Sequence, residues 1–175
     1  MQYYIIRVLT GKEKKYITWI QRTLSSDFGR IIWPRRCLAV RRSGIVKERV
    51  SSLYPGYLFF ETRELSDHAI IVLKRAPGFV RFLKSDNNIV PLNNRDKVLF
   101  LELIAQGETI RKSQVVFDEK NRIRILDGPL KLLEGDIVKV DRRKGRAKVK
   151  LHFHELSLLF DLGFEVMEII PKRIE

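Results

Sequence analysis

The sequence predicts an α+β protein in which an antiparallel sheet flanked by helices is followed by a linker and a small β-barrel. Apolar residues in the first part of the chain alternate between strand spacing and helix spacing. The chain turns polar after Gly107, and beyond Arg122 its apolar segments are short and separated by turn residues. We therefore expect a first domain at 1–107, a linker at 108–121 and a barrel domain at 122–175.

The first domain opens with a strand and a helix. Residues 3–8 are aromatic and β-branched and stop at a Thr-Gly pair, which predicts a strand. Residues 12–24 carry apolar side chains at helical spacing, which predicts an amphipathic helix with a basic outer face. Strand character returns at 31–40 and 50–60, and Ser43-Gly44 supplies the turn between them.

Two more helices and two short strands complete this domain. A helix capped by Ser66 is predicted to end before Pro77, because proline cannot continue it. Short strands are predicted at 79–83 and 89–90, and a third helix runs from an Asn-Asn pair to Gly107. The order β-α-β-β-α-β-α favours one antiparallel sheet with helices packed on it.

The polarity of residues 108–121 and the short apolar segments after them predict the linker and the barrel. Residues 108–121 lack a long apolar face, although the short apolar run 115–117 leaves docking on a neighbour open. The segments beyond it alternate with turns, a pattern typical of a small β-barrel. They are 123–126, 136–140, 147–153, 156–160 and 164–170.

The charge of the chain points to an anionic partner. The 34 Lys and Arg residues against 21 Asp and Glu residues leave a net charge of +13 and a pI near 10.1. An excess of this size favours nucleic acid, because lysine and arginine neutralise phosphates and release counterions. A merely soluble, basic protein is the alternative.

The sequence also bears on compartment and chemistry. Cys37 is the single cysteine, which excludes an intramolecular disulfide, and no apolar run is long enough for a membrane span or a signal peptide. We expect a cytoplasmic monomer without a membrane partner. His152 and His154 alternate onto one strand face, but two histidines without further ligands are more often structural. We therefore expect no catalytic residue, no metal and no cofactor, and no enzyme.

Two sets of motifs resemble the NusG family of transcription elongation factors. The first set matches the family's N-terminal (NGN) domain in the same order, at 3–4, 10–13, 53–60, 76–80 and 90–92. The second, residues 127–138, is similar to the turn and strand of the family's C-terminal KOW domain, with Leu132 where a further glycine is usual. The resemblance implies an NGN-like domain followed by an SH3-like KOW barrel.

A basic hairpin at 141–146 and the Asp-Leu-Gly-Phe run at 161–164 are similar to the LoaP antiterminators within this family. That likeness implies an elongation and antitermination factor that binds RNA polymerase through its first domain and a structured leader RNA through the KOW domain. Two alternatives stay open. One is a general NusG factor that links polymerase to Rho or the ribosome, and the other is a plain KOW protein for RNA binding or ribosome assembly.

The resemblance places the polymerase contact on the strand at 53–60. Tyr54, Tyr57 and nearby Tyr3 would form an apolar surface for the polymerase clamp helices, with Pro55 and Gly56 at its turn. Leu58 and Phe60 would then lie in the core. Core packing of the tyrosines themselves is the alternative, since Tyr57 and Phe59 share one side of a strand.

Two basic groups are the candidate nucleic-acid contacts, and for each the alternative is a solvated basic face. Residues bordering the Pro77-Gly78 turn are expected at upstream or non-template DNA: Lys74, Arg75, Arg81 and Lys84. Basic residues crowding the hairpin at 35–49 share that expectation. The expected RNA contacts lie in and around the second hairpin, and within the twelve residues 139–150 only Asp141 opposes the positive charge. They are Lys131, Arg142, Arg143, Lys144, Arg146, Lys148 and Lys150.

Overall fold

The computed structural model describes residues 1–85, 88–153 and 156–168, and it confirms a mixed α+β chain. The side chains of Arg42, Lys84, Ser85, Phe153 and Leu156 lie outside this description. The chain forms two compact units, each discontinuous in sequence. Unit 1 comprises Met1–Pro34, Ser52–Leu101 and His152–Ser157, and unit 2 comprises Arg35–Ser51, Glu102–Leu151 and the chain from Leu158.

Unit 1 is built on a four-stranded antiparallel sheet in the order β2-β5-β1-β6. The strands are β1 (Gln2–Val8), β2 (Arg30–Ile32), β5 (Tyr57–Thr62) and β6 (Phe79–Phe82). The central strand β1 is the aromatic and β-branched run that the sequence marks as a strand. In its register Ile5 faces Phe59, and Arg7 faces Tyr57 on one side and Arg81 on the other.

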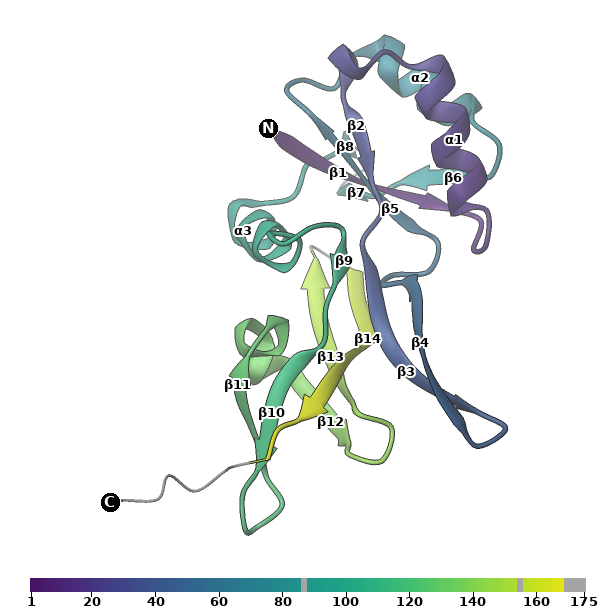
Figure 1. Ribbon diagram of the computed structural model, residues 1–175. Coiled ribbons are helices and arrows are strands. Elements are labelled where there is room, and N and C mark those ends of the chain that lie inside the picture. The colour runs from purple at the N-terminus through teal and green to yellow at the C-terminus, as the bar shows by residue number, and fades with distance from the viewer. Residues whose placement is uncertain (86–87, 154–155, 169–175) are drawn as a thin grey trace. The chain divides into compact units, whose positions relative to one another are not determined.

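Helices α1 (Glu13–Thr23) and α2 (Asp67–Arg75) lie together over one face of this sheet (Figure 1). That face contributes Leu58 and Phe60, both fully buried, so their predicted place in the core is confirmed. The Tyr16 hydroxyl joins the two helices by donating to the Leu73 carbonyl at 3.0 Å. The predicted cap of α2 also forms, since the Ser66 hydroxyl accepts a hydrogen bond from a backbone N–H of the first turn at 3.2 Å.

The opposite face of the sheet is covered by α3 (Asn94–Leu103). Tyr3 and Ile5 on β1 and Phe59 on β5 point to this side, because side chains alternate along a strand. The Phe100 ring stacks on Phe59 with 4.1 Å between centroids and meets Tyr3 edge-on at 5.6 Å. The centre of the sheet is therefore buried on both faces.

Unit 2 contains a five-stranded sheet in the order β11-β10-β14-β13-β12, in which β10 and β14 run parallel. Its strands are β10 (Ser113–Phe117), β11 (Ile123–Asp127), β12 (Ile137–Asp141), β13 (Arg146–Phe153) and β14 (Leu156–Val166). The 3-10 helix η2 (Pro129–Asp136) connects β11 to β12. Gly128 precedes it at φ +98°, as expected for a turn that only glycine adopts readily.

Two sequence predictions about this unit were wrong. Residues 108–121 are not simply a linker, because the apolar run 115–117, for which docking was left open, belongs to β10 inside the sheet, with Val115 and Val116 buried. The segments 156–160 and 164–170 are not separate strands either, because β14 runs through Gly163 without a turn. A Cβ at Gly163 would lie 2.7 Å from the Cys37 carbonyl oxygen, so glycine serves a close backbone approach there.

A hairpin of β3 (Arg35–Arg42) and β4 (Ile45–Ser52) belongs to unit 2, although the sequence groups it with the first domain. Ser43 and Gly44 both have positive φ, which forms the tight turn that was predicted. The hairpin is held by Arg36, which donates to the Asp161 carbonyl at 2.6 Å, and by short β9 (Thr109–Ile110), which pairs parallel with β3. The domain boundaries 1–107 and 122–175 stay a prediction.

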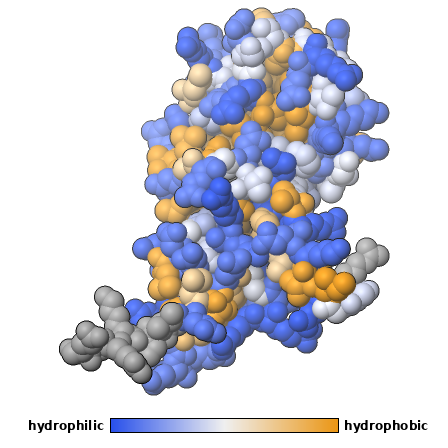
Figure 2. Space-filling view, viewed as in Figure 1, coloured by the Kyte–Doolittle hydropathy of each residue, from blue (hydrophilic) through white to orange (hydrophobic). Residues whose placement is uncertain are grey.

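The remaining elements are short. They are the 3-10 helix η1 (Ser26–Phe28) and the two-stranded sheet of β7 (Lys84–Ser85) with β8 (Asn88–Ile89). On the face drawn in Figure 2, hydrophilic residues dominate and hydrophobic ones form separate patches. Within the described ranges, no helix is both long and apolar enough to span a membrane.

Candidate functional site

Three loops of unit 1 meet at one end of the sheet: residues 9–12, 54–57 and 76–79. The Val8 amide donates to the Gly56 carbonyl, and the Leu9 amide donates to the Gly78 carbonyl, both at 2.8 Å. These hydrogen bonds tie the first loop to each of the other two. We call the three loops, with the strand ends that carry Arg7 and Arg81, the loop end.

Gly56 fixes the centre of the loop end. Its φ is +81°, and a Cβ there would lie 2.8 Å from the Thr10 hydroxyl and 3.0 Å from the Val8 carbonyl oxygen. Its N–H donates to the carboxylate of Glu13 at 2.7 Å, and Glu13 is itself buried. The Pro-Gly turn is therefore required by backbone conformation and space, and it sets where β5 begins.

A row of three side chains crosses the sheet beside this turn. Tyr57, Arg7 and Arg81 are register partners on β5, β1 and β6 and so share a face. The Arg7 guanidinium donates to the Tyr57 hydroxyl at 3.0 Å and lies 5.4 Å from the ring centroid. Tyr57 is half-buried while both arginines are exposed, so the row presents an aromatic ring beside two cations.

Further cations border the same loops. Lys74 and Arg75 are exposed in the last turn of α2, directly before the loop at 76–79. Lys12 is exposed too, and its Cβ lies 3.2 Å from the position that a Cβ of Gly78 would take. The structure thus brings three of the four predicted DNA contacts to the loop end, whereas the side chain of Lys84 lies outside the described part.

Two of the three predicted polymerase-contact tyrosines are buried. Tyr3 is 4% exposed and Tyr54 is 3% exposed, so the predicted surface of three tyrosines is not formed. Tyr3 is buried because Phe100 of α3, which is distant in the sequence, covers its ring. Of the three rings, only Tyr57 is accessible, next to exposed Pro55.

Tyr3 instead takes part in a polar cluster at the opposite end of the sheet from Tyr57. Its hydroxyl donates to the Glu61 carboxylate, which also pairs with Arg30. Burial and this hydrogen bond raise the pKa of Tyr3 to about 12. Burial alone would raise the pKa of Glu61, but the Tyr3 hydroxyl and the Arg30 guanidinium outweigh it and lower that pKa below its ordinary value.

In unit 2, the hairpin of β12 and β13 carries most of the predicted RNA contacts. Its turn is closed by the Asp141 carboxylate, which accepts from the Lys144 amide at 2.9 Å, and Gly145 follows at φ +59°. Alternation along β13 buries Ala147, Val149 and Leu151. The intervening cations are therefore set on the other face: Arg146, Lys148 and Lys150.

Several of these cations already have partners in unit 2. The Arg142 guanidinium lies 4.6 Å from the Phe117 ring centroid and donates to Asn121 at 2.8 Å. Asp161 on β14 lies 2.9 Å from the Lys148 ammonium and 3.6 Å from the Arg146 guanidinium. Asp141 is the single carboxylate within residues 139–150, and β14 brings a second one, Asp161, from outside the hairpin.

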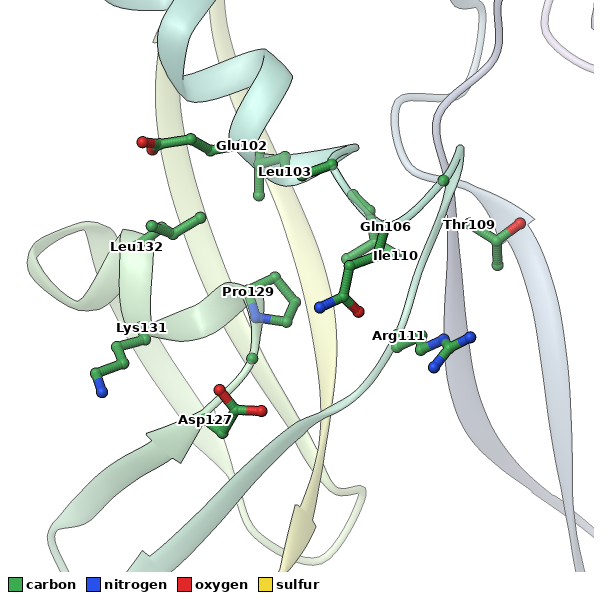
Figure 3. Close-up of a pocket in the computed structure, with 13 residues that line it drawn as sticks. Glu102, Leu103, Gln106, Thr109, Ile110, Arg111, Asp127, Pro129, Lys131 and Leu132 are labelled. Carbon is green, nitrogen blue, oxygen red and sulfur yellow. The ribbon is translucent and has the colours of Figure 1, made fainter.

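Lys131 lies apart from the cations of the β12–β13 hairpin, at a different cavity of unit 2. It is exposed on η2 and borders a cavity of about 280 Å³ together with Gln106, Arg111 and Pro129. Figure 3 shows Gln106 and Pro129 facing each other there, while the Lys131 ammonium points outward. Arg143, Lys144 and Arg146 line a different cavity, so the structure does not join Lys131 to them.

Comparison with known proteins identifies the family. A family model described as "Transcription termination factor nusG" matches residues 1–101, more than half of the 175 residues. The chain belongs to the NusG family. Among its relatives, the "Transcription termination/antitermination protein NusG" of Thermus thermophilus is 27% identical over 94% of this chain and 96% of its own length. The protein of that name from Bacillus subtilis is 24% identical over 93% and 94%.

A solved structure of a NusG protein has a similar fold. The structure titled "Domain interaction in Thermotoga maritima NusG" matches 93% of each chain with a TM-score of 0.59 at 24% identity. The match spans both parts of the chain. It therefore agrees with a NusG fold beyond the segment that the family model covers.

Within this NusG-family chain, sequence reasoning missed Arg7 and Asp161. Arg7 follows Tyr3 and Ile5 at the strand period, so its face was readable, but its partner Tyr57 is set by strand pairing. Asp161 comes close to the hairpin only because its strand β14 lies next to β13 in the sheet. No group of three potential metal ligands occurs among the residues that the structure describes, and His154 lies outside them.

Proposed function

We propose that this NusG-family chain is a transcription elongation and antitermination factor of the LoaP type, acting as a monomer. Residues 1–107 hold RNA polymerase, and residues 122–175 form an SH3-like KOW domain that holds a structured leader RNA. The loop end carries the proposal, because it sets the accessible ring of Tyr57 beside Arg7, with Arg81 next in the same row. The names of the relatives support a role in transcription termination and antitermination.

The polymerase contact is the turn formed by Pro55, Gly56 and Tyr57, with exposed Leu9 beside it. A half-buried aromatic ring held by a neighbouring guanidinium is already ordered, so its binding to an apolar surface loses little conformational entropy. This proposal assigns to upstream or non-template DNA the adjacent cations Lys74, Arg75 and Arg81, together with Lys84, whose side chain lies outside the described part. No bond is made or broken, and the factor acts by stabilising the processive state of the polymerase.

The RNA contact is the β12–β13 hairpin. Arg143, Lys144 and Lys150 are exposed, whereas Arg146 and Lys148 share the Asp161 carboxylate. Exposed cations on a tight hairpin contact phosphates, and arginine also reaches base edges. Arg142 supports the hairpin through Phe117, and Lys131 serves as an outlying contact.

The polymerase assignment is tested by Tyr57→Ala, with Phe28→Ala as the control. Phe28 is another partly exposed aromatic residue of unit 1, 37% exposed, on η1 rather than in the loops. Aromatic anchors contribute about 2 kcal/mol or more, so Tyr57→Ala should weaken binding to purified polymerase by roughly 30-fold while Phe28→Ala binds normally. Unchanged polymerase binding by a folded Tyr57→Ala protein would reject this assignment.

A second candidate function is favoured by the comparisons. Relatives named NusG match over more than nine-tenths of this chain, which supports a general NusG factor acting without a dedicated leader. A termination assay with purified polymerase separates the two. Read-through that requires a leader in the template supports the LoaP type, and equal read-through on every template supports the general factor.

A further inference from the structure

A second cavity of unit 2 lies between its two hairpins, β3–β4 and β12–β13. Its volume is about 420 Å³, and both hairpins supply its lining. We call it the two-hairpin groove. It is lined by Ala39, Val40, Arg41, Val46, Arg143, Lys144 and Arg146.

Hydrogen bonds between strands hold the two walls of the groove in place. The Arg146 guanidinium donates to the Ala39 carbonyl at 3.0 Å, which joins β13 to β3. Arg36 on β3 donates to the Asp161 carbonyl on β14 at 2.6 Å. Both walls therefore belong to one packed unit, and a ligand would find them already in place.

The lining is cationic and contains no carboxylate. It holds four basic side chains, and Arg41 and Arg143 are exposed without an ion pair to any side chain that the structure describes. A smaller cavity of about 160 Å³ shares Lys144 and Arg146 with the groove, and its other lining residues are Lys139, Lys148 and the acidic residues Asp141 and Asp161. Basic side chains thus continue from the groove along the face of β13, where Asp141 and Asp161 neutralise part of their charge.

The rest of the lining is aliphatic. Ala39, Val40 and Val46 contribute apolar surface, and Val46 is 55% exposed although it lies on a strand. A cavity of this volume is in the range that holds a small organic molecule or one nucleotide. An apolar wall with guanidinium groups above it suits a flat base attached to a phosphate, because arginine planes stack on bases.

We propose that the two-hairpin groove receives one unpaired nucleotide of the RNA that the β12–β13 hairpin binds. Arg41 stacks on or bonds to the base, and Arg143 and Lys144 contact the flanking phosphates. This inference rests on the proposed RNA-binding function and adds to it a residue from the first half of the chain. A base inside a duplex cannot enter such a groove, so the proposal selects RNA with a bulge or an open loop.

The test uses two synthetic RNA stem-loops that differ by a single unpaired nucleotide in the stem, prepared with each of the four bases. Fluorescence anisotropy of the full-length protein measures both affinities. The parent should prefer at least one bulged RNA to the paired RNA. Arg41→Ala should lose roughly tenfold on that bulged RNA, the usual effect of one base stack, with little change on the paired RNA.

The matched control is Arg49→Ala, an equal charge change on the same hairpin at an exposed position outside the groove lining. It should weaken both RNAs equally or not at all. Arg41→Lys keeps the charge but loses the planar stack, so it should recover only part of the preference. Val46→Trp, which fills the groove, should abolish the preference for the bulge while circular dichroism shows a folded chain.

The outcomes separate this inference from the function on which it rests. A parent that binds bulged and paired RNAs equally, or an Arg41→Ala protein that loses no more than Arg49→Ala on the bulged RNA, overturns the groove. In that case, weaker binding by Arg143→Ala with Lys144→Ala still upholds the hairpin as the RNA contact. A parent that ignores both RNAs at low ionic strength overturns both proposals.

Discussion

Replacing Asp161 with asparagine should make the β12–β13 hairpin a stronger RNA contact. Asp161 is the carboxylate that Lys148 and Arg146 share, at 2.9 Å and 3.6 Å. Asparagine keeps the shape and one acceptor oxygen but removes the charge. The backbone carbonyl of residue 161 still accepts from Arg36, so the packing of β3 on β14 should survive.

The expected size follows from the exposure of the pair. The side chains are 38% exposed for Lys148, 22% for Arg146 and 20% for Asp161, and ion pairs of this kind contribute about 0–1 kcal/mol. The free energy of unfolding should fall by no more than that. RNA affinity at low salt should rise by up to about fivefold, and each released cation should steepen the salt dependence on single strands by about 0.7.

The assay is fluorescence anisotropy with a labelled single-stranded RNA over a series of salt concentrations. Asp118→Asn is the control, because Asp118 pairs with Arg122 at 2.8 Å in the same unit but not on the hairpin. It makes the same charge change and should leave the salt slope unaltered. A slope for Asp161→Asn equal to that of the parent would refute the reasoning, since the released cations would then meet no phosphate.

Three predictions concern stability, measured by urea unfolding. The pKa of Glu61 is lowered in the folded chain, so the ionised carboxylate stabilises the fold above its ordinary pKa of about 4.5, and this stabilisation is lost as pH falls through the folded pKa. The loss of unfolding free energy in Glu61→Gln should therefore become smaller in acid. A loss that is the same at every pH would contradict this. Gly128→Ala should cost about 1–3 kcal/mol, because φ is +98° and ψ −178°, whereas Gly135→Ala, which has open space, should cost much less. Phe100→Ala, at 1% exposure, should cost about 3–5 kcal/mol, and a loss below about 1 kcal/mol would show that α3 does not seal the sheet.

Elements with local signals could be predicted from the sequence, and those that depend on distant pairing could not. The helix predicted at 12–24 forms as α1, because its apolar spacing lies within a few turns. Strand β10 offered only the short apolar run 115–117 in polar surroundings, and Val115 and Val116 are buried because β11 and β14 flank them. Gly163 led to a wrong prediction of a strand break, because the sequence does not distinguish a glycine that permits close backbone approach from one that forms a turn.

The candidate site divides in the same way. The exposure of Tyr57 follows from its place at the first residue of a strand next to a Pro-Gly turn. The burial of Tyr3 depends on Phe100, nearly a hundred residues away, and no local pattern marks that contact. The partial neutralisation of the second hairpin by Asp161 likewise needs the order of the sheet, which one sequence does not specify.

Unit 2 is assembled from segments that lie far apart in the sequence, which has a consequence for its folding during synthesis. Arg36 and the Asp161 carbonyl that it contacts are 125 positions apart, so about 6–25 s pass between their synthesis at typical translation rates. The hairpin β3–β4 can close within microseconds, yet its contact with β14 has to wait until residue 161 has been synthesised. Completion of this unit is accordingly among the last folding events on the ribosome, and a transcript truncated before codon 161 would yield a hairpin without the carbonyl that Arg36 contacts.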